Sequence, residues 1–352
     1  MTDSDKPQGH DYRRRRILIA GAAGAAVSAA GGLLYLRSGH HHHTGREPDG
    51  RFRRITLAWP DPASDPVALV ARAKGFYARY SLEVTLLPGT GNGAAAISAM
   101  NASADCLGAV APVLTWLPSL YGGPVDARLT GGLSSGTYRL LARNSAHITR
   151  IEDIPGRKIA VISEESADRR FLSVLLRRKG INPDGGVQWV YLPPDQAPDA
   201  LLAGQADALV AHDPFAWTVL AAHRSEMTEL TGSDTGNYSS RINHALGLKA
   251  GFLRNDPDGA LALVLALRDS CVWIEKNTDQ IPALLSQSLP DTDDQILEEM
   301  IRHQALPHHS FGNSFRDQVA QYADELKLIG VLPEEMHSGE IASRFCQNVF
   351  RN

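Results

Sequence analysis

Cysteine is scarce in this sequence. The 352 residues include three cysteines, Cys106, Cys271 and Cys346, which lie far apart. No pair has the two-residue spacing typical of zinc ligands, and an odd number at this separation gives no disulfide framework. No cysteine follows the apolar run near the N-terminus, which argues against a lipid anchor. We therefore expect no metal and no cofactor, and we expect the thiols to act as small buried apolar groups.

Clustered basic residues are missing from most of the chain. Residues 1–54 contain ten Lys or Arg and five Asp or Glu, a net charge of +5; because the whole chain carries −4, residues 55–352 carry −9. Binding to phosphate backbones needs clustered Lys and Arg, so we expect no nucleic acid partner. The composition, 43% hydrophobic and 21% charged, is that of an ordinary globular protein, and the length allows two lobes with separate cores.

One long run without charge is present, at residues 17–36, directly after Arg13–Arg16. Basic residues before an apolar, small-residue-rich run resemble a twin-arginine export signal, although Arg13 stands where Ser or Thr is usual. The run either is cleaved as a signal or stays as a membrane tether, since about 20 apolar residues can span a bilayer. Both interpretations of residues 1–37 place the folded part outside the cytoplasm. Residues 38–54, with His40–His43, are expected to be a polar linker, to which we assign no function.

Short apolar runs alternate with helical patterns along residues 55–220. The clearest unit is a strand at Lys158–Ile162, an amphipathic helix that stops at Gly180, and a strand at Val187–Leu192. Such alternation predicts α/β lobes in which crossover helices connect parallel strands. Further segments expected from the same pattern are strands at Ile55–Trp59, Leu82–Leu87, Cys106–Val110, Ala127–Leu133, Thr137–Arg143 and Ala208–Ala211, and helices at residues 65–80, 94–100 and 112–120.

Four segments together resemble a known family. They are ARAKGFYARYSLEVT at 71–85, IEDIPGRKIAV at 151–161, LLAGQADALV at 201–210, and DPF at 213–215. Their order and spacing are similar to those of the solute-binding proteins of ABC importers in the nitrate, sulfonate, taurine and bicarbonate group, whose domain is SsuA/THI5-like or NMT1-like.

The resemblance implies a fold class and a domain organisation. The fold would be a two-lobed periplasmic-binding-protein type II α/β fold, in which each lobe is a mostly parallel sheet flanked by helices, with a helical C-terminal extension. We expect lobe 1 at 55–145, lobe 2 at 146–240, and a return to lobe 1 with C-terminal helices at 241–352. The extension would pack on the first lobe, and the segments near 143–150 and 238–250 would form the hinge. Helices of the extension are expected near 259–277, 279–288, 292–304, 314–330 and 334–349.

Ligands of such sheets bind at the carboxyl ends of the strands. The corners expected there offer free backbone N–H groups at helix starts, small residues, hydroxyls and one aromatic wall. The candidate ligand-binding residues are Trp59, Pro60, Asp61, Thr90, Gly91, Asn92, Val110, Ala111, Ser134, Ser135, Gly136, Ser163, Glu165, Ser166 and Asp213.

Structural roles compete with ligand binding at several of these positions. Trp59 could pack in the core, Ser163 could cap a helix, and for Asp213 a helix cap before Pro214 is the favoured interpretation. The glycine-rich turn at 89–93 lacks the Lys-Ser/Thr ending of a phosphate loop, which disfavours a nucleotide.

The carboxylates leave the charge of the ligand open. If Asp61, Glu165 and Asp213 face the cleft, they disfavour an oxyanion and favour a cationic or neutral ligand such as an amine or a pyrimidine. If they face outward, they only complement helix dipoles.

Three functions are compatible with the sequence. The leading hypothesis is an exported, monomeric solute-binding protein that closes two lobes over a nitrate-, sulfonate-, taurine- or bicarbonate-like solute or a thiamine-precursor pyrimidine, and delivers it to an ABC permease. The alternatives are an enzyme on the same fold, of the pyrimidine-synthesis or C–S cleavage type with Cys106 as nucleophile, and a sensory ligand-binding module tethered through residues 17–36. Cys106 stands at the start of its strand, away from the ligand end, and no local motif pairs it with His212, so we expect no enzyme.

Overall fold

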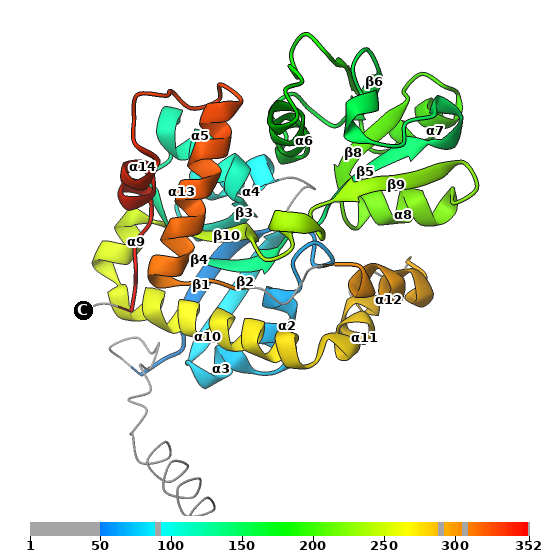
Figure 1. Cartoon of the computed structure of the whole chain (residues 1–352). Coiled ribbons are helices and arrows are strands. Elements are labelled where there is room, and N and C mark those ends of the chain that lie inside the picture. Colours follow the sequence, from blue (N-terminus) through cyan, green and yellow to red (C-terminus); the bar gives the residue numbers. More distant parts are fainter. Residues whose placement is uncertain (1–49, 89–92, 288–291, 305–308, 351–352) are drawn as a thin grey trace, which may run out of the picture. The chain divides into compact units, whose positions relative to one another are not determined.

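The computed structural model describes residues 50–88, 93–287, 292–304 and 309–350. These residues belong to one compact unit, 43–352, which holds two five-stranded sheets flanked by helices (Figure 1). The segment expected to be an export signal or anchor and most of the expected linker lie outside the described residues, and so do Thr90, Gly91 and Asn92. Among the described residues, no helix is both long and apolar enough to cross a membrane.

The first sheet has the strand order β2-β1-β3-β10-β4. The neighbours β2, β1 and β3 are parallel, and β10 runs antiparallel to both β3 and β4, so four strands share one direction. The strand β10 is the return to the first lobe that the apolar run near residue 243 predicts. The strands are β1 (Arg53–Trp59), β2 (Leu82–Pro88), β3 (Cys106–Pro112), β4 (Ala127–Ser135) and β10 (Ile242–Lys249).

The second sheet has the strand order β7-β6-β8-β5-β9. The neighbours β7, β6 and β8 are parallel, and β5 runs antiparallel to both β8 and β9. Each sheet therefore has four strands in one direction and one reversed, which confirms the predicted mostly parallel lobes. The strands are β5 (Tyr138–Arg143), β6 (Lys158–Val161), β7 (Gln188–Tyr191), β8 (Ala208–His212) and β9 (Met227–Gly232).

The chain crosses between the sheets earlier than predicted. It leaves the first sheet after Ser135 and enters the second at Tyr138, because β5 pairs with β8 and β9. The expected boundary at 145/146 and the expected hinge at 143–150 therefore differ from the observed crossing. The apolar pattern of β5 predicts a buried strand but cannot specify its sheet. The chain returns between Gly232 and Ile242, so most of the expected second hinge segment is strand β10.

The helices flank the sheets at positions close to those predicted. The expected helix at 65–80 is divided at Gly75, whose positive φ of 72° interrupts it. The helices are α2 (Val67–Ala73), α3 (Phe76–Arg79), α4 (Gly93–Ala102), α5 (Val113–Gly122), α6 (Ala167–Arg178), α7 (Ala197–Leu202), α8 (Phe215–Ala222), α9 (Ala250–Asn255), α10 (Pro257–Lys276), α11 (Ile281–Ser286), α12 (Asp294–Arg302), α13 (Gly312–Leu328) and α14 (Ser338–Phe345).

The C-terminal extension contacts both lobes. Helix α10 packs against α2 and β4 of the first lobe, as expected. Helix α12 instead meets α8 of the second lobe, where Arg224 pairs with Glu299 and the Trp217 and His303 rings stack with centroids 4.8 Å apart. Trp217 packs into the apolar cluster that contains Leu133 of the first sheet. The extension therefore helps to join the two lobes.

Candidate functional site

A cavity of about 90 Å³ lies where strand ends of both sheets meet helix starts. Its walls come from the ends of β1, β3 and β8, the starts of α4, α5 and α6, and the two crossings between the sheets. It is lined by Pro60, Ser64, Gly93, Ala94, Pro112, Thr115, Thr137, Tyr138, Ser163, Glu165, Ser166, Ala167, Asp168, His212, Asn243 and His244.

Three helices begin at this cavity, each of ten residues or more. The first-turn N–H groups of a helix lack intrahelical partners and carry partial positive charge. Gly93 permits the close approach of α4 to β3, because a Cβ there would lie 2.4 Å from Pro112 Cδ and 2.9 Å from Ala111 Cβ. Ser166 caps α6, and its Oγ accepts a hydrogen bond from the Arg169 N–H at 3.2 Å. The arrangement suits a negatively charged or strongly polar group.

Three buried residues that line this cavity have side-chain polar atoms without a hydrogen-bond partner. Within the described part of the chain, Thr137 Oγ1, Tyr138 Oη and both side-chain polar atoms of Asn243 have no hydrogen-bond partner. These residues are only 2%, 3% and 2% exposed. An unsatisfied buried polar group costs about 1–3 kcal/mol, so retaining several at one cavity points to a bound partner. Burial raises the pKa of Tyr138 well above its usual value and Asp168 adds to this, while the neighbouring Asn243 side chain acts in the opposite direction, so the phenol stays protonated.

Two histidines at the cavity are each held by a buried carboxylate. His212 Nδ1 lies 2.9 Å from Asp168 Oδ1, and the two side chains come from β8 and the first turn of α6. His244 Nδ1, on β10, lies 3.4 Å from Asp65 Oδ2, which also accepts a hydrogen bond from Ser134 Oγ at 2.7 Å. Such contacts fix the orientation of each imidazole ring relative to the cavity.

Four of the predicted residues line the cavity. They are Pro60 at the end of β1, and Ser163, Glu165 and Ser166 before α6. Ser134 does not line it but contacts His244 from behind, with Oγ 3.2 Å from Nδ1. That these four residues contact a ligand stays a prediction, and the cavity is where the contact would occur.

Other predicted residues lie in the core or in turns. Trp59 is 2% exposed, and its indole N–H donates to the Asp65 carbonyl. Asp61 accepts from the Ala63 N–H in the turn after β1. The remaining predicted residues that do not line the cavity are all buried: Val110, Ala111, Ser135, Gly136 and Asp213.

Asp213 has a role that the sequence did not predict. It does not cap α8, whose N-cap is Pro214. Its carboxylate is fully buried and binds Arg139 at 2.9 Å, with Gln304 as a further donor. Arg139 also pairs with Glu229. Because the Asp213 charge is neutralised inside the protein, it does not contribute a free carboxylate to the cavity.

Twelve of the sixteen lining residues are not among the predicted ligand-binding residues. The strand-end rule places ligand contacts at Ser135 and Gly136, whereas Thr137 and Tyr138 of the crossing line the cavity. The pair Asn243-His244 at the start of an otherwise apolar strand was the available signal, and it was interpreted only as part of a strand. The other missed lining residues are Ser64, Gly93, Ala94, Pro112, Thr115, Ala167, Asp168 and His212.

Cys106 takes no part in this cavity. It is fully buried at the first residue of β3, whereas Pro112 at the last residue of that strand lines the wall. Its Sγ contacts the Gly108 carbonyl at 3.3 Å, and burial raises its pKa. A protonated, buried thiol at the opposite strand end is not an activated nucleophile.

Known proteins share this architecture. The chain resembles the solved structures of the periplasmic aliphatic sulphonate binding protein SsuA from Escherichia coli, with a TM-score of 0.67, 15% identity, and coverage of 84% of this chain and 92% of that chain. It also resembles the periplasmic nitrate-binding protein NrtA from Synechocystis PCC 6803, with a TM-score of 0.68, 13% identity, and coverage of 84% and 86%. The desulfurization enzyme DSZB shares the fold at a TM-score of 0.57 and 16% identity, with coverage of 84% and 97%.

At the level of sequence, the bicarbonate transport ATP-binding protein CmpC of Synechococcus elongatus is 26% identical over 221 residues, or 60% of this chain. The chain spans about a third of the length of that relative, 32%. The profile described as NMT1/THI5 like matches residues 67–281, well over half of the chain. The two sheets and the structural neighbours establish the periplasmic-binding-protein type II fold, and the profile match shows that the chain belongs to the NMT1/THI5-like family.

Proposed function

We propose that this protein is the exported solute-binding component of an ABC importer. It captures a small solute in the cavity between the lobes and delivers it to a permease. The observation that carries the proposal is the set of unsatisfied polar atoms of Thr137, Tyr138 and Asn243 in one small cavity. A ligand would satisfy these atoms and bridge both lobes, which is the condition for ligand-driven closure.

The wall chemistry favours a ligand with a compact oxyanion group. Three helix starts and several hydroxyl and amide groups supply donors, and none of the described lining residues is Lys or Arg. The undescribed segment 89–92, Gly-Thr-Gly-Asn, contributes no charged residue by sequence. Glu165 and Asp168 both line the same cavity, and their carboxylates disfavour further negative charge, so an oxyanion group carried by a zwitterion such as taurine fits better than one carried by a simple anion. Nitrate, bicarbonate, a short sulfonate or taurine therefore fit better than a polyanion.

Transport rather than catalysis is supported by the same geometry. The thiol that a C–S cleavage mechanism would use is buried away from the cavity. The His212–Asp168 pair lies at the cavity, at the opposite end of the strands from the Cys106 thiol. The export signal and the small solute are consistent with each other, since an importer collects its cargo outside the cytoplasm.

The first experiment is a thermal-shift and calorimetry panel on the processed protein. The panel contains nitrate, bicarbonate, ethanesulfonate, taurine and a hydroxymethylpyrimidine. A ligand at about 1,000 times its dissociation constant stabilises the native state by about 4 kcal/mol. We expect one class of compound in the panel to bind with one-to-one stoichiometry. Asn243→Ala should weaken the affinity for that compound about tenfold or more.

The matched control is Asn237→Ala, an exposed asparagine outside the cavity, which is expected to leave the affinity unchanged. Consumption of a panel compound on incubation would instead establish an enzyme. Absence of binding by every compound, in protein confirmed as folded, would contradict the proposed solute classes.

A further inference from the structure

Helix α6 connects the cavity to a second contact between the lobes. Its N-terminal residues Ser166, Ala167 and Asp168 line the cavity, and its last turn carries Arg178. Arg178 lies on the second lobe, and its Nη2 is 2.6 Å from Glu325 Oε1 on α13 of the extension. Because α6 is one continuous twelve-residue helix, a movement of its first turn is transmitted to its last.

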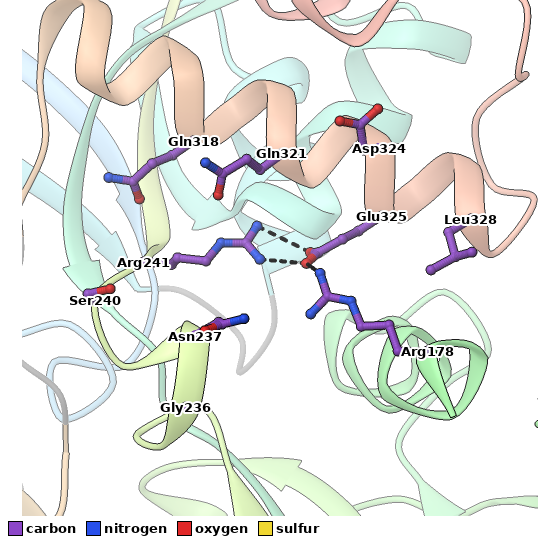
Figure 2. Close-up of a pocket in the computed structure, with 10 residues that line it drawn as sticks. All are labelled: Arg178, Gly236, Asn237, Ser240, Arg241, Gln318, Gln321, Asp324, Glu325 and Leu328. Carbon is purple, nitrogen blue, oxygen red and sulfur yellow. Dashed lines mark hydrogen bonds and ion pairs between the residues drawn. The ribbon is translucent and has the colours of Figure 1, made fainter. Parts of the chain in front are cut away.

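Figure 2 shows Glu325 at the centre of an open pocket, with Arg241 and Arg178 reaching it from different elements. Arg241 donates to both carboxylate oxygens, and Tyr238 Oη donates to Oε1 at 2.9 Å. Tyr238 and Arg241 belong to the segment by which the chain returns to the first sheet. Glu325 is 3% exposed, so it needs these partners to remain charged inside the protein.

The contact with Arg178 can be released at low cost. If Arg178 moves away, Glu325 keeps Arg241 and Tyr238, so no buried charge is left unpaired. The Arg178 side chain is 42% exposed already and regains water readily. An exposed partner of this kind contributes little to an ion pair, about 1 kcal/mol or less.

A second contact between the lobes, made by Arg139 and Asp213, is buried instead of exposed. The Arg139 and Asp213 side chains are 2% and 0% exposed, and they bind His303 and Gln304 of the extension. Arg139 and Asp213 both belong to the second lobe and remain paired with each other, so opening the lobes here would break only their buried hydrogen bonds to His303 and Gln304. Breaking buried hydrogen bonds to charged groups costs more than releasing an exposed partner, so the Arg178 contact opens more readily.

We propose that the Arg178–Glu325 ion pair is a releasable latch, which holds α6 of the second lobe against α13 and so stabilises the closed arrangement of the cavity. The claim that the latch raises ligand affinity rests on the proposed function. The claim that the ion pair holds the lobes together concerns the ligand-free protein and does not depend on that function. The contribution of the latch to affinity follows from population shift, because apparent affinity falls with the fraction of closed molecules.

The test measures the distance between the lobes in ligand-free protein. Spin labels on Glu83→Cys and Leu202→Cys, two exposed positions on β2 and α7, report it by pulsed electron resonance. We expect Arg178→Ala to raise the ratio of open to closed molecules roughly fivefold, and Arg178→Lys to restore part of the closed population.

Arg177→Ala is the matched control, because Arg177 is the neighbouring residue in the same helix turn and pairs only weakly with Asp184 within the second lobe, at 3.9 Å. It removes the same interaction with the helix dipole but not the latch. Salt at 1 M should shift the unmodified protein toward the open form more strongly than Arg178→Ala, because the exposed Arg224–Glu299 pair is screened in both and the Arg178–Glu325 pair only in the unmodified protein. Identical distance distributions for Arg178→Ala and Arg177→Ala, or equal responses to salt, would overturn the proposal.

A second arm separates the latch from the proposed function. Any compound that binds in the panel should bind Arg178→Ala more weakly, by up to about fivefold according to the closed fraction of the unmodified protein. If no compound binds but the distances respond as expected, the latch stands and the proposed function fails. If a compound binds all variants equally and the distances do not change, the latch fails and the proposed function stands.

Discussion

Tyr138 is the residue at which stability and ligand binding are most cleanly separated. Its hydroxyl is buried and has no hydrogen-bond partner among the described residues, while its ring stacks on Phe171 with centroids 4.9 Å apart. Tyr138→Phe keeps the ring and removes the unsatisfied group. We expect the free energy of unfolding of the free protein to stay constant or to rise by about 1 kcal/mol.

The same substitution should weaken ligand binding about five- to tenfold, since a hydrogen bond between neutral groups contributes about 1 kcal/mol. Urea unfolding and calorimetry on the same preparation measure the two effects. Tyr322→Phe, at a buried tyrosine with no part in the cavity, is the control for ligand affinity. A Tyr138→Phe protein that binds as tightly as the unmodified one would remove Tyr138 from the site.

The three thiols give a second prediction at the residue scale. Burial raises the pKa of Cys346 to about 12, and it raises the pKa values of Cys106 and Cys271 as well. Only the thiolate reacts with iodoacetamide, so the native protein should resist alkylation at pH 8, and all three thiols should react after unfolding in guanidinium. Rapid alkylation of one thiol in the native protein would instead support the enzyme interpretation.

The raised pKa values also set the sign of a pH effect. A thiol whose pKa is higher in the folded state than in the unfolded state stabilises the protein fully below the unfolded value, about 8.5. This stabilisation is lost as the pH rises above that value toward the folded pKa. The free energy of unfolding should therefore fall above about pH 8.5, and less steeply in a Cys346→Ser variant.

Four of the predicted ligand-binding residues lie where the strand-end rule places them, and their contact with a ligand stays a prediction. Pro60, Ser163, Glu165 and Ser166 follow strands or precede a helix, and they line the cavity. The helix cap predicted for Asp213 is wrong. Its carboxylate pairs with Arg139, which is 74 residues away, and no local sequence pattern indicates such a pairing.

At the scale of elements, Gly93 decides how closely α4 approaches the end of β3. A Cβ at this position would lie within 3 Å of atoms of Pro112 and Ala111. Gly93→Ala should displace the start of α4, lower the free energy of unfolding by about 1–3 kcal/mol, and weaken ligand binding. Chemical denaturation and the ligand titration test both effects.

Gly122→Ala is the matched control for this substitution. Gly122 is also a glycine of a ten-residue helix, α5, and a Cβ there would meet no atom within 4 Å. Alanine at this position should be neutral or stabilising by up to about 1 kcal/mol. If Gly93→Ala behaves like Gly122→Ala, the close approach of α4 is not required for the site.

The order of elements was predictable because each strand and helix carries its own period of apolar residues. The strand predicted at Lys158–Ile162 is observed at Lys158–Val161, and helix α6 ends two residues before Gly180, whose positive φ stops the helical pattern as predicted. The sheet to which β5 belongs was not predictable. Its pairing with β8 and β9 depends on contacts distant in sequence, which a local pattern does not contain.

At the scale of the whole molecule, the lobes share a core contact that should make them unfold together. Trp217 of α8 is 5% exposed and packs in the apolar cluster that also holds Leu133 and Leu246 of the first sheet. Arg139 and Asp213 add hydrogen bonds to His303 and Gln304. These contacts are buried, so separating the lobes would expose apolar surface and charged groups to water.

We therefore expect a single cooperative unfolding transition, with circular dichroism and tryptophan fluorescence coincident and equal calorimetric and van't Hoff enthalpies. Trp217→Ala weakens the shared contact and should cost about 3–5 kcal/mol, with the transition becoming less cooperative. Trp189→Ala, on β7, is the control, because Trp189 donates to the Pro183 carbonyl and lies under Arg169, both of its own lobe. It should lower stability while leaving one transition, since the contact between the lobes is intact.

Two transitions in the unmodified protein would show that the lobes are independent folding units, and ligand closure would then depend on the crossing segments and the Arg178 contact alone.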